Sequence, residues 1–152
     1  PEERLPPERR HSAMTTVAYK DGKLAADKRI SIHNAEVSKA FRDDDGNLYG
    51  VIGKLAPALM VVEWLMGRAD KPNPFEEDDS FYVLMVEKAT GQIFMFDYFL
   101  HALPIESKFF ALGSGSSYAM GAMAQGASAK KAVEIASLFD DSTGSGVEVL
   151  VL

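Results

Sequence analysis

Closely spaced hairpin signals, separated by helix-periodic stretches, limit the folds open to this chain. Asp21-Gly22 and the run at 43–46 (Asp-Asp-Asp-Gly) are turn sequences between β-rich segments. The predicted strands of these two hairpins cover residues 16–19, 23–32, 36–42 and 47–52. Strands joined by such short turns pair antiparallel.

The acidic turn at 43–46 also suggests a calcium loop. An EF-hand loop requires Gly at its sixth position and Glu at its twelfth. Counted from Asp43, Gly46 is fourth and the twelfth position is Lys54. The pattern therefore favours a turn.

Helical spacing begins after the second hairpin. One face is formed by Leu55, Ala58, Leu59, Val62, Leu65 and Met66. Gly67 ends this stretch, and a Pro-rich acidic loop follows at 71–79. Its run at 76–79 (Glu-Glu-Asp-Asp) is typical of a solvated loop, with docking of a basic partner as the alternative.

The second half repeats the same signals. Further strands are predicted at 81–87, 92–98, 109–113 and 147–152, and a helix at 116–125. Ser128 is placed to cap another helix, on which Ala132, Val133, Ala136 and Phe139 share a face. Segregated runs of strands and helices of this kind indicate an α+β fold with antiparallel sheets.

Composition narrows the function classes. The chain has 152 residues, 47% hydrophobic and 25% charged, as expected for one globular domain. The absence of cysteine excludes disulfides, thiolate metal sites and a cysteine nucleophile, and fits a reducing, cytoplasmic location. A net charge of −6 argues against nucleic-acid binding. No apolar run approaches ~18 residues, so we expect no membrane span.

Residues 1–14 differ from the rest. They contain three prolines and many charges without apolar periodicity, so they cannot bury enough surface to offset their ordering entropy. We interpret them as a propeptide, an expression leader or residues that precede a natural start at Met14. The folded domain is then expected at 15–152.

Thr15, which follows Met14, is a candidate nucleophile. A threonine at a chain start can use its own α-amine, with a reference pKa near 8, as the base for its hydroxyl. Thr15-Thr16, the segment 25–29 (Ala-Ala-Asp-Lys-Arg) and Gly-Ser-Gly at 113–115 occur in the order seen in proteasome β-subunits and the bacterial HslV peptidase. The chain resembles this N-terminal-threonine (Ntn) hydrolase family, which implies a four-layer αββα sandwich over nearly all of 15–152.

The resemblance also implies roles for particular residues. It implies that the catalytic residues are Thr15, Asp27, Lys39, Ser114, Asp140 and Thr143. The backbone N–H of Gly53 would stabilise the oxyanion, and Ser31 and Val51 would bind substrate. Lys39 is expected within about 4 Å of Asp27, where its ammonium lowers the pKa of the attacking group. Lys28 alternates away from Asp27 on the same strand.

Some assignments have alternatives. Asp27 could be a solvent-facing strand acid, and Gly53 a simple strand-end glycine. Asp141 and Ser142 are alternative registers for the supporting acid and hydroxyl. A phosphate loop at 113–116 is disfavoured because Gly-x-x-x-x-Gly-Lys is missing.

The family implies a threonine-type endopeptidase that forms homo-oligomeric rings and cleaves peptides or unfolded proteins, with a possible ATPase unfoldase cap. We expect neither cofactor nor metal, since His11, His33 and His101 lack ligand spacing. The loop at 69–80 replaces a long helix of the family, which puts docking to a standard cap in doubt. Alternatives are a catalytically silent ring or assembly protein whose leader blocks Thr15, and an Ntn amidohydrolase acting on small amides.

Overall fold

The computed structural model describes residues 12–13, 15–29, 36–141, 143–144 and 146–152. Within these ranges it contains two antiparallel sheets and three helices, so the predicted α+β class is confirmed. The loop between the first helix and the next strand has no helix of its own, as predicted from its short Pro-rich sequence.

The first sheet has six strands. They are β1 (Ser12–Ala13), β4 (Ala40–Arg42), β5 (Leu48–Lys54), β6 (Phe81–Val86), β7 (Ile93–Phe96) and β8 (Leu103–Ile105). Their order is β1-β5-β6-β7-β8, and β4 also pairs with β5. Because β4 and β1 pair with successive parts of β5, together they line one side of that strand.

The second sheet has four strands in the order β10-β3-β2-β9. Their bounds are β2 (Thr16–Lys20), β3 (Lys23–Asp27), β9 (Phe110–Gly113) and β10 (Val147–Val151). The hairpin predicted around Asp21-Gly22 is present, with Lys20 opposite Lys23, and both turn residues have positive φ. Its register brings the start of β2 and the end of β3 to the same end of the sheet.

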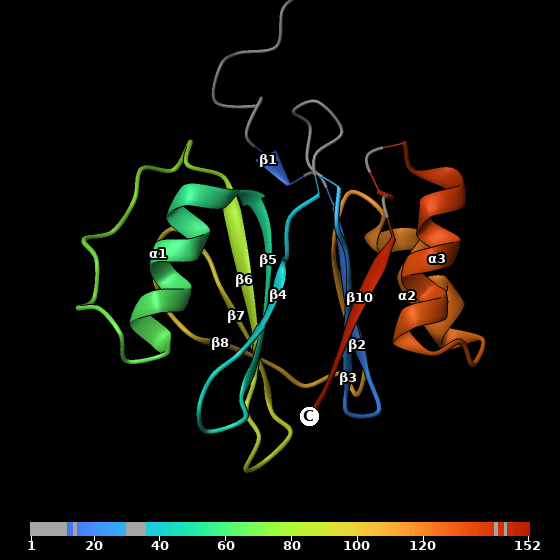
Figure 1. The fold of residues 1–152 in the computed structure, drawn as a ribbon, viewed down its shortest axis with the longest axis horizontal. Helices are drawn as coiled ribbons and strands as arrows, with labels where there is room; N and C mark the ends of the chain where they lie inside the picture. Colours follow the sequence, from blue (N-terminus) through green and yellow to red (C-terminus); the bar gives the residue numbers. More distant parts are fainter. Residues whose placement is uncertain (1–11, 14, 30–35, 142, 145) are drawn as a thin grey trace, which may run out of the picture.

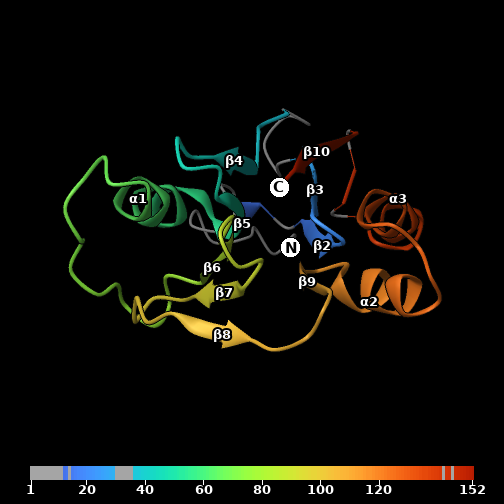
Figure 2. The same cartoon turned by 90° about the horizontal axis from the view of Figure 1, so that it is seen from below.

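Helices cover the outer faces of both sheets (Figures 1 and 2). The helices are α1 (Leu55–Leu65), α2 (Ser116–Ala124) and α3 (Ala129–Phe139). Figure 2 shows α1 outside the six-stranded sheet, and α2 and α3 side by side outside the four-stranded sheet.

Three apolar clusters hold these layers together. Leu24 and Leu84 belong to the cluster between the two sheets. Val61 anchors α1 in a cluster with residues of β5 and β6. Met123 of α2 and Val133 of α3 pack in a third cluster against small residues of β2 and β3. Burying a side chain of this size stabilises a fold by about 1.5–3 kcal/mol, so each interface contributes substantially.

Several predicted boundaries were wrong. The strand expected at 23–32 ends at Asp27, and the strand expected at 36–42 begins at Ala40. Lys28 donates its backbone N–H to Gly144 instead, and Arg29 pairs only in an isolated bridge. Both ends of this connection therefore leave the sheets, while residues 30–35 lie outside the described chain.

Two predicted helix faces need correction. On α1 the buried residues are Ala58, Val61 and Val62, whereas Leu59 is 38% exposed. On α3 the predicted face holds as far as Ala136, but Phe139 is 63% exposed. Phe139 stands in the last turn of α3, where its ring stacks on Tyr118 of α2 rather than on the sheet.

The acidic turn at 43–46 is built around one carboxylate. Asp43 accepts hydrogen bonds from the backbone N–H groups of Asp45 and Asn47, the Asn47 amide and the Tyr49 hydroxyl. Burial opposes ionisation, but these donors lower the pKa of Asp43. The Asp43 carboxylate accepts hydrogen bonds from the turn itself, which supports a turn over a calcium loop.

Candidate active site

Asp27 and Lys39 form a buried ion pair that joins the end of one strand of the four-stranded sheet to the residue before one strand of the six-stranded sheet. Asp27 is the last residue of β3, and Lys39 immediately precedes β4. Lys39 Nζ lies 3.2 Å from Asp27 Oδ1, and both side chains are 0% exposed. The predicted contact is therefore confirmed, and the alternative of a solvent-facing Asp27 is wrong. Lys39 Nζ also donates to the backbone carbonyl of Arg29.

Backbone donors complete the surroundings of Asp27. The N–H of Gly144 lies 2.9 Å from Oδ2, and the N–H of Thr16 lies 3.2 Å from Oδ1. Burial raises the pKa of Asp27, although Lys39 and these donors oppose the shift. Burial likewise lowers the pKa of Lys39 against the attraction of Asp27. The ammonium is thus easier to deprotonate than that of an exposed lysine.

A second cluster joins the end of β9 to the end of α3. Asp140, which caps α3, accepts hydrogen bonds at Oδ2 from Ser114 Oγ at 2.5 Å and from Thr143 Oγ1 at 2.7 Å. Of the alternative registers, Asp141 is exposed and its carbonyl accepts a hydrogen bond from Arg29, while Ser142 lies outside the described residues. The geometry therefore favours Asp140 and Thr143.

Thr15 and Thr16 lie between these two clusters. Thr16 donates its backbone N–H to Asp27, and its Oγ1 lies 2.9 Å from Thr143 Oγ1. Thr15 is fully buried, and Ser114 Oγ lies 3.5 Å from its carbonyl oxygen. Within the described part of the chain, Thr15 Oγ1 has no hydrogen-bond partner. Leaving a buried hydroxyl without a partner costs roughly 1–3 kcal/mol, so its position beside these two clusters calls for an explanation.

Gly53 occupies a position that excludes a side chain. Its φ is +83°, and an added Cβ would lie 2.4 Å from the carbonyl oxygen of Ser80 and 2.7 Å from Cα of Phe81. Across the strand, Gly53 pairs with Ala13 of β1, and Lys54 pairs with Ser12. The end of β5 is therefore paired with the short antiparallel strand β1, which Figure 1 shows at the end of the sheets.

The two predicted substrate-binding residues are less informative. Ser31 lies outside the described residues. Val51 is fully buried in the cluster beneath α1, and its N–H donates to the Lys39 carbonyl at 2.9 Å. Val51 thus fixes the segment that carries Lys39, while a role in a specificity pocket stays a prediction.

Sequence reasoning missed Thr16 and Gly115. A Cβ at Gly115 would lie 2.1 Å from Thr16 Oγ1 and 3.3 Å from Asp140 Oδ2, so glycine leaves the space in which these groups meet. The available signals were the second threonine of Thr15-Thr16 and the second glycine of the Gly-Ser-Gly segment. Neither signal indicates that Thr143 is the hydrogen-bond partner of Thr16.

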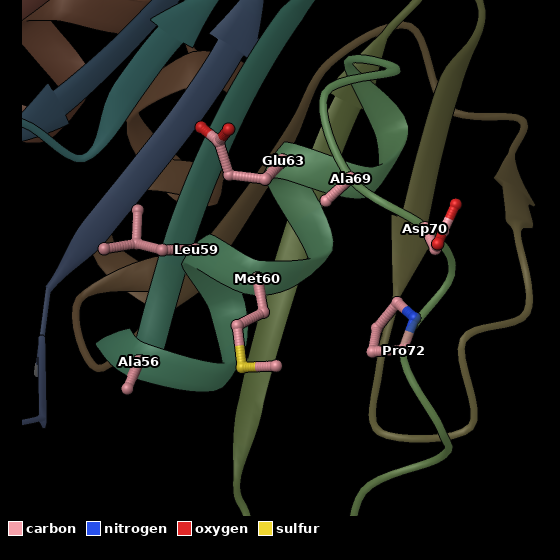
Figure 3. Close-up of a pocket in the computed structure, with 7 residues that line it drawn as sticks. All are labelled: Ala56, Leu59, Met60, Glu63, Ala69, Asp70 and Pro72. Atoms are coloured by element: carbon pink, nitrogen blue, oxygen red, sulfur yellow. The ribbon is translucent and has the colours of Figure 1, made fainter.

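Of two cavities of similar volume, one adjoins the candidate site and the other lies apart from it. One, of about 410 Å³, adjoins Asp27 and Gly144 and is rimmed by Lys130 and Glu134 of α3. The other, of about 420 Å³, is a groove on the outer face of α1 (Figure 3). The groove is lined by Ala56, Leu59, Met60, Glu63, Ala69, Asp70 and Pro72. The side chains of this groove are mostly apolar, with the carboxylates of Glu63 and Asp70 and no hydroxyl, thiol or imidazole among them.

Comparison with known proteins gives no match to a family model or to a curated protein. Among the described residues, no helix combines the length and apolar character needed to cross a membrane. The same residues hold no group of three or more His, Cys, Asp or Glu side chains suited to a metal ion. Function must therefore be inferred from the arrangement around Thr15.

Proposed function

We propose that the chain is a threonine-type endopeptidase subunit whose nucleophile is Thr15. The observation that carries this proposal is the position of Thr15 and Thr16 between the Asp27–Lys39 pair and the Ser114–Asp140–Thr143 cluster. These residues come from five separate segments, and structural packing alone does not require a buried ion pair and a buried hydroxyl without a hydrogen-bond partner at one place.

The proposed reaction starts when the α-amine of Thr15 accepts the proton of its own hydroxyl. The alkoxide oxygen attacks the peptide carbonyl, the amine fragment leaves with a proton, and an ester to Thr15 remains. Water then hydrolyses this ester and restores the threonine. The Lys39 ammonium stabilises negative charge on the attacking oxygen, Asp27 holds Lys39 in place, and the Gly53 N–H stabilises the oxyanion.

Substrate is proposed to bind as an added strand on β5. The support for this mode is the pairing of Ser12–Ala13 with Gly53 and Lys54, because it demonstrates that this edge accepts an extended segment. Ser31 and Gly53 are proposed to flank the substrate, and Val51 is proposed to line the specificity pocket. Peptides and unfolded proteins can supply such segments, whereas folded domains cannot.

The fold type, the assembly and the location of the protein are part of the same proposal. The two sheets between helical layers are proposed to be an Ntn-hydrolase sandwich, assembled in a homo-oligomeric ring in the cytoplasm. The loop at 69–80 stands where the family has a further helix, so an ATPase cap that docks there would need a different contact surface.

The leader supports a second candidate function. While residues before Thr15 remain attached, the Thr15 nitrogen is part of a peptide bond and cannot act as the base. A subunit that keeps its leader would be a catalytically silent ring or assembly protein. An amidohydrolase acting on small amides shares the nucleophile and differs only in its substrate.

Hydrolysis assays on a chain that begins at Thr15 distinguish these functions. The proposal predicts cleavage of unstructured peptides, no cleavage by the Thr15→Ala variant, and little activity on small amides. Cleavage of small amides alone would favour the amidohydrolase. No hydrolysis of either substrate by the chain with a free Thr15 amine would favour the silent protein.

A further inference from the structure

Thr16 connects the Asp27–Lys39 ion pair with the Ser114–Asp140–Thr143 cluster. Its backbone N–H bonds Asp27 Oδ1 at 3.2 Å, and its hydroxyl oxygen lies 2.9 Å from that of Thr143. The Thr16 side chain is fully buried, and Thr143 is 3% exposed. The contact is therefore dry, and each hydroxyl must find its hydrogen-bond partner within the protein.

The direction of the hydrogen bonds follows from the number of available protons. Thr143 has one hydroxyl proton, and the Asp140 carboxylate, which only accepts when ionised, lies 2.7 Å away. With that proton directed to Asp140, the Thr143 oxygen is left as an acceptor toward Thr16. Thr16 must then donate, which gives a chain that runs from Thr16 through Thr143 to Asp140.

The second glycine of the 113–115 segment keeps this chain short. A Cβ at Gly115 would lie 2.1 Å from Thr16 Oγ1 and 2.9 Å from Cβ of Ala136. Any larger residue would push β2 and α3 apart at the point where the hydroxyl groups meet. The absence of a side chain at Gly115 therefore allows the Thr16 and Thr143 hydroxyl groups to approach each other closely.

We propose that Thr16 is a positioning residue that holds Thr143, Asp140 and, through Asp140, Ser114 in the orientation that Thr15 requires. The inference rests on the proposed function, because it concerns the reaction of Thr15. Thr16 itself touches no substrate. Its hydroxyl donates to the Thr143 oxygen and so holds the Thr143 side chain in the orientation that bonds Asp140. Asp140 in turn holds Ser114 at 2.5 Å, and Ser114 lies beside the Thr15 carbonyl at 3.5 Å.

The test uses Thr16→Val, which keeps the branched shape and removes the hydroxyl, and Thr16→Ser, which keeps the hydroxyl. Both changes are made in the chain that begins at Thr15. Thr90→Val is the matched control, because the Thr90 hydroxyl lies in an exposed turn and bonds Glu87 outside the site. Peptide hydrolysis gives kcat and KM for each variant.

We expect Thr16→Val to lower kcat about tenfold or more with KM within about twofold, since an interaction used in the chemical step is lost while substrate binding is kept. Thr16→Ser should recover most of kcat, and Thr90→Val should match the parent. A Thr16→Val variant with unchanged kcat would overturn the inference. So would failure of Thr16→Ser to recover any of a large loss.

A crystal structure of Thr16→Val tests the positioning without any assay. The inference predicts that Thr143 turns away from Asp140 and that the 2.7 Å contact is lost. An unchanged Thr143–Asp140 contact would overturn it, whether or not the chain hydrolyses peptides. If instead the parent never forms an ester at Thr15 while the contact is lost in Thr16→Val, the proposed function fails and the positioning role in this network stands.

Discussion

The Lys39 ammonium lies 3.2 Å from the Asp27 carboxylate with neither side chain reached by solvent. Removing one partner leaves the other charge buried and unpaired, which typically costs about 3–5 kcal/mol. Lys39→Ala should therefore lower the free energy of unfolding by about this amount and abolish peptide hydrolysis. Urea titration measures the first effect. Lys28→Ala is the control and should change stability by less than about 0.5 kcal/mol; the opposite ranking would contradict the assignment.

The same pair predicts a pH dependence of stability. Burial lowers the pKa of Lys39 below the ordinary lysine value of 10.5, so the unfolded chain keeps this proton to a higher pH. Between the two values unfolding takes up a proton, and the free energy of unfolding contributed by this group rises with pH. Lys39→Met should lose this alkaline rise in urea titrations at several pH values. A rise that persists in Lys39→Met must come from other groups.

Asp27 gives the matching effect in acid. Burial raises its pKa above the ordinary value of 3.8, so the folded chain keeps the proton longer than the unfolded chain. In that interval unfolding releases a proton, and the contribution of this group to stability falls as pH rises. In urea titrations at several acidic pH values, Asp27→Asn should not show this fall. If the free energy of unfolding of Asp27→Asn changed with pH in the same way as that of the parent, the buried carboxyl would not be its source.

Gly53 should tolerate substitution far less well than Gly67. Both have positive φ, +83° and +79°, which costs an alanine about 1–2 kcal/mol in each case. Only at Gly53 would the added Cβ also meet backbone atoms, at 2.4 Å and 2.7 Å, whereas nothing lies within 4 Å at Gly67. We expect thermal unfolding to show Gly53→Ala at least about 1 kcal/mol less stable than Gly67→Ala. Equal losses would mean that backbone strain alone is being measured.

Lys20 should stabilise the end of α2. Its Nζ donates to the carbonyls of Met123 at 2.9 Å and Ala127 at 3.1 Å, where a helix carries partial negative charge. Lys20→Met should therefore cost about 1–2 kcal/mol in the free energy of unfolding. Lys23→Met, at an exposed position of the same hairpin, is the control. A Lys20 effect no larger than the Lys23 effect would contradict a capping role.

The strands and helices were largely predictable because turn residues and apolar spacing are local signals. Asp21-Gly22 predicted its hairpin directly. β8 was missed because Pro104 cannot donate in a ladder, and only its place at the sheet edge permits it there. Phe139 was misplaced because helical spacing does not reveal where the neighbouring sheet ends.

The site was predictable only in part. Asp27, Lys39, Ser114 and Asp140 are expected from a resemblance to a family. The contacts that join them to Thr15 and Thr16 depend on long-range packing, since Ser114 and Thr15 are 99 residues apart and Thr143 and Thr16 are 127 apart. The role of Thr16 could not be predicted in this way, because its hydroxyl has a hydrogen-bond partner only once the fold brings Thr143 beside it. Likewise, the pairing of Ser12–Ala13 with β5 has no local signal in the charged, Pro-rich leader.

The role of Thr15 as nucleophile is tested most directly with a β-lactone, an electrophile that acylates nucleophilic hydroxyls. The β-lactone is added to two chains, and the adducts are located by intact-mass and peptide-mapping mass spectrometry. One chain begins at Thr15 and the other retains residues 1–14. We expect a single adduct, located at Thr15, in the first chain and none in the second, because only a free α-amine can accept the hydroxyl proton. An adduct at Thr15 in the chain that keeps its leader, or no adduct at Thr15 in the chain that begins there, would contradict this role.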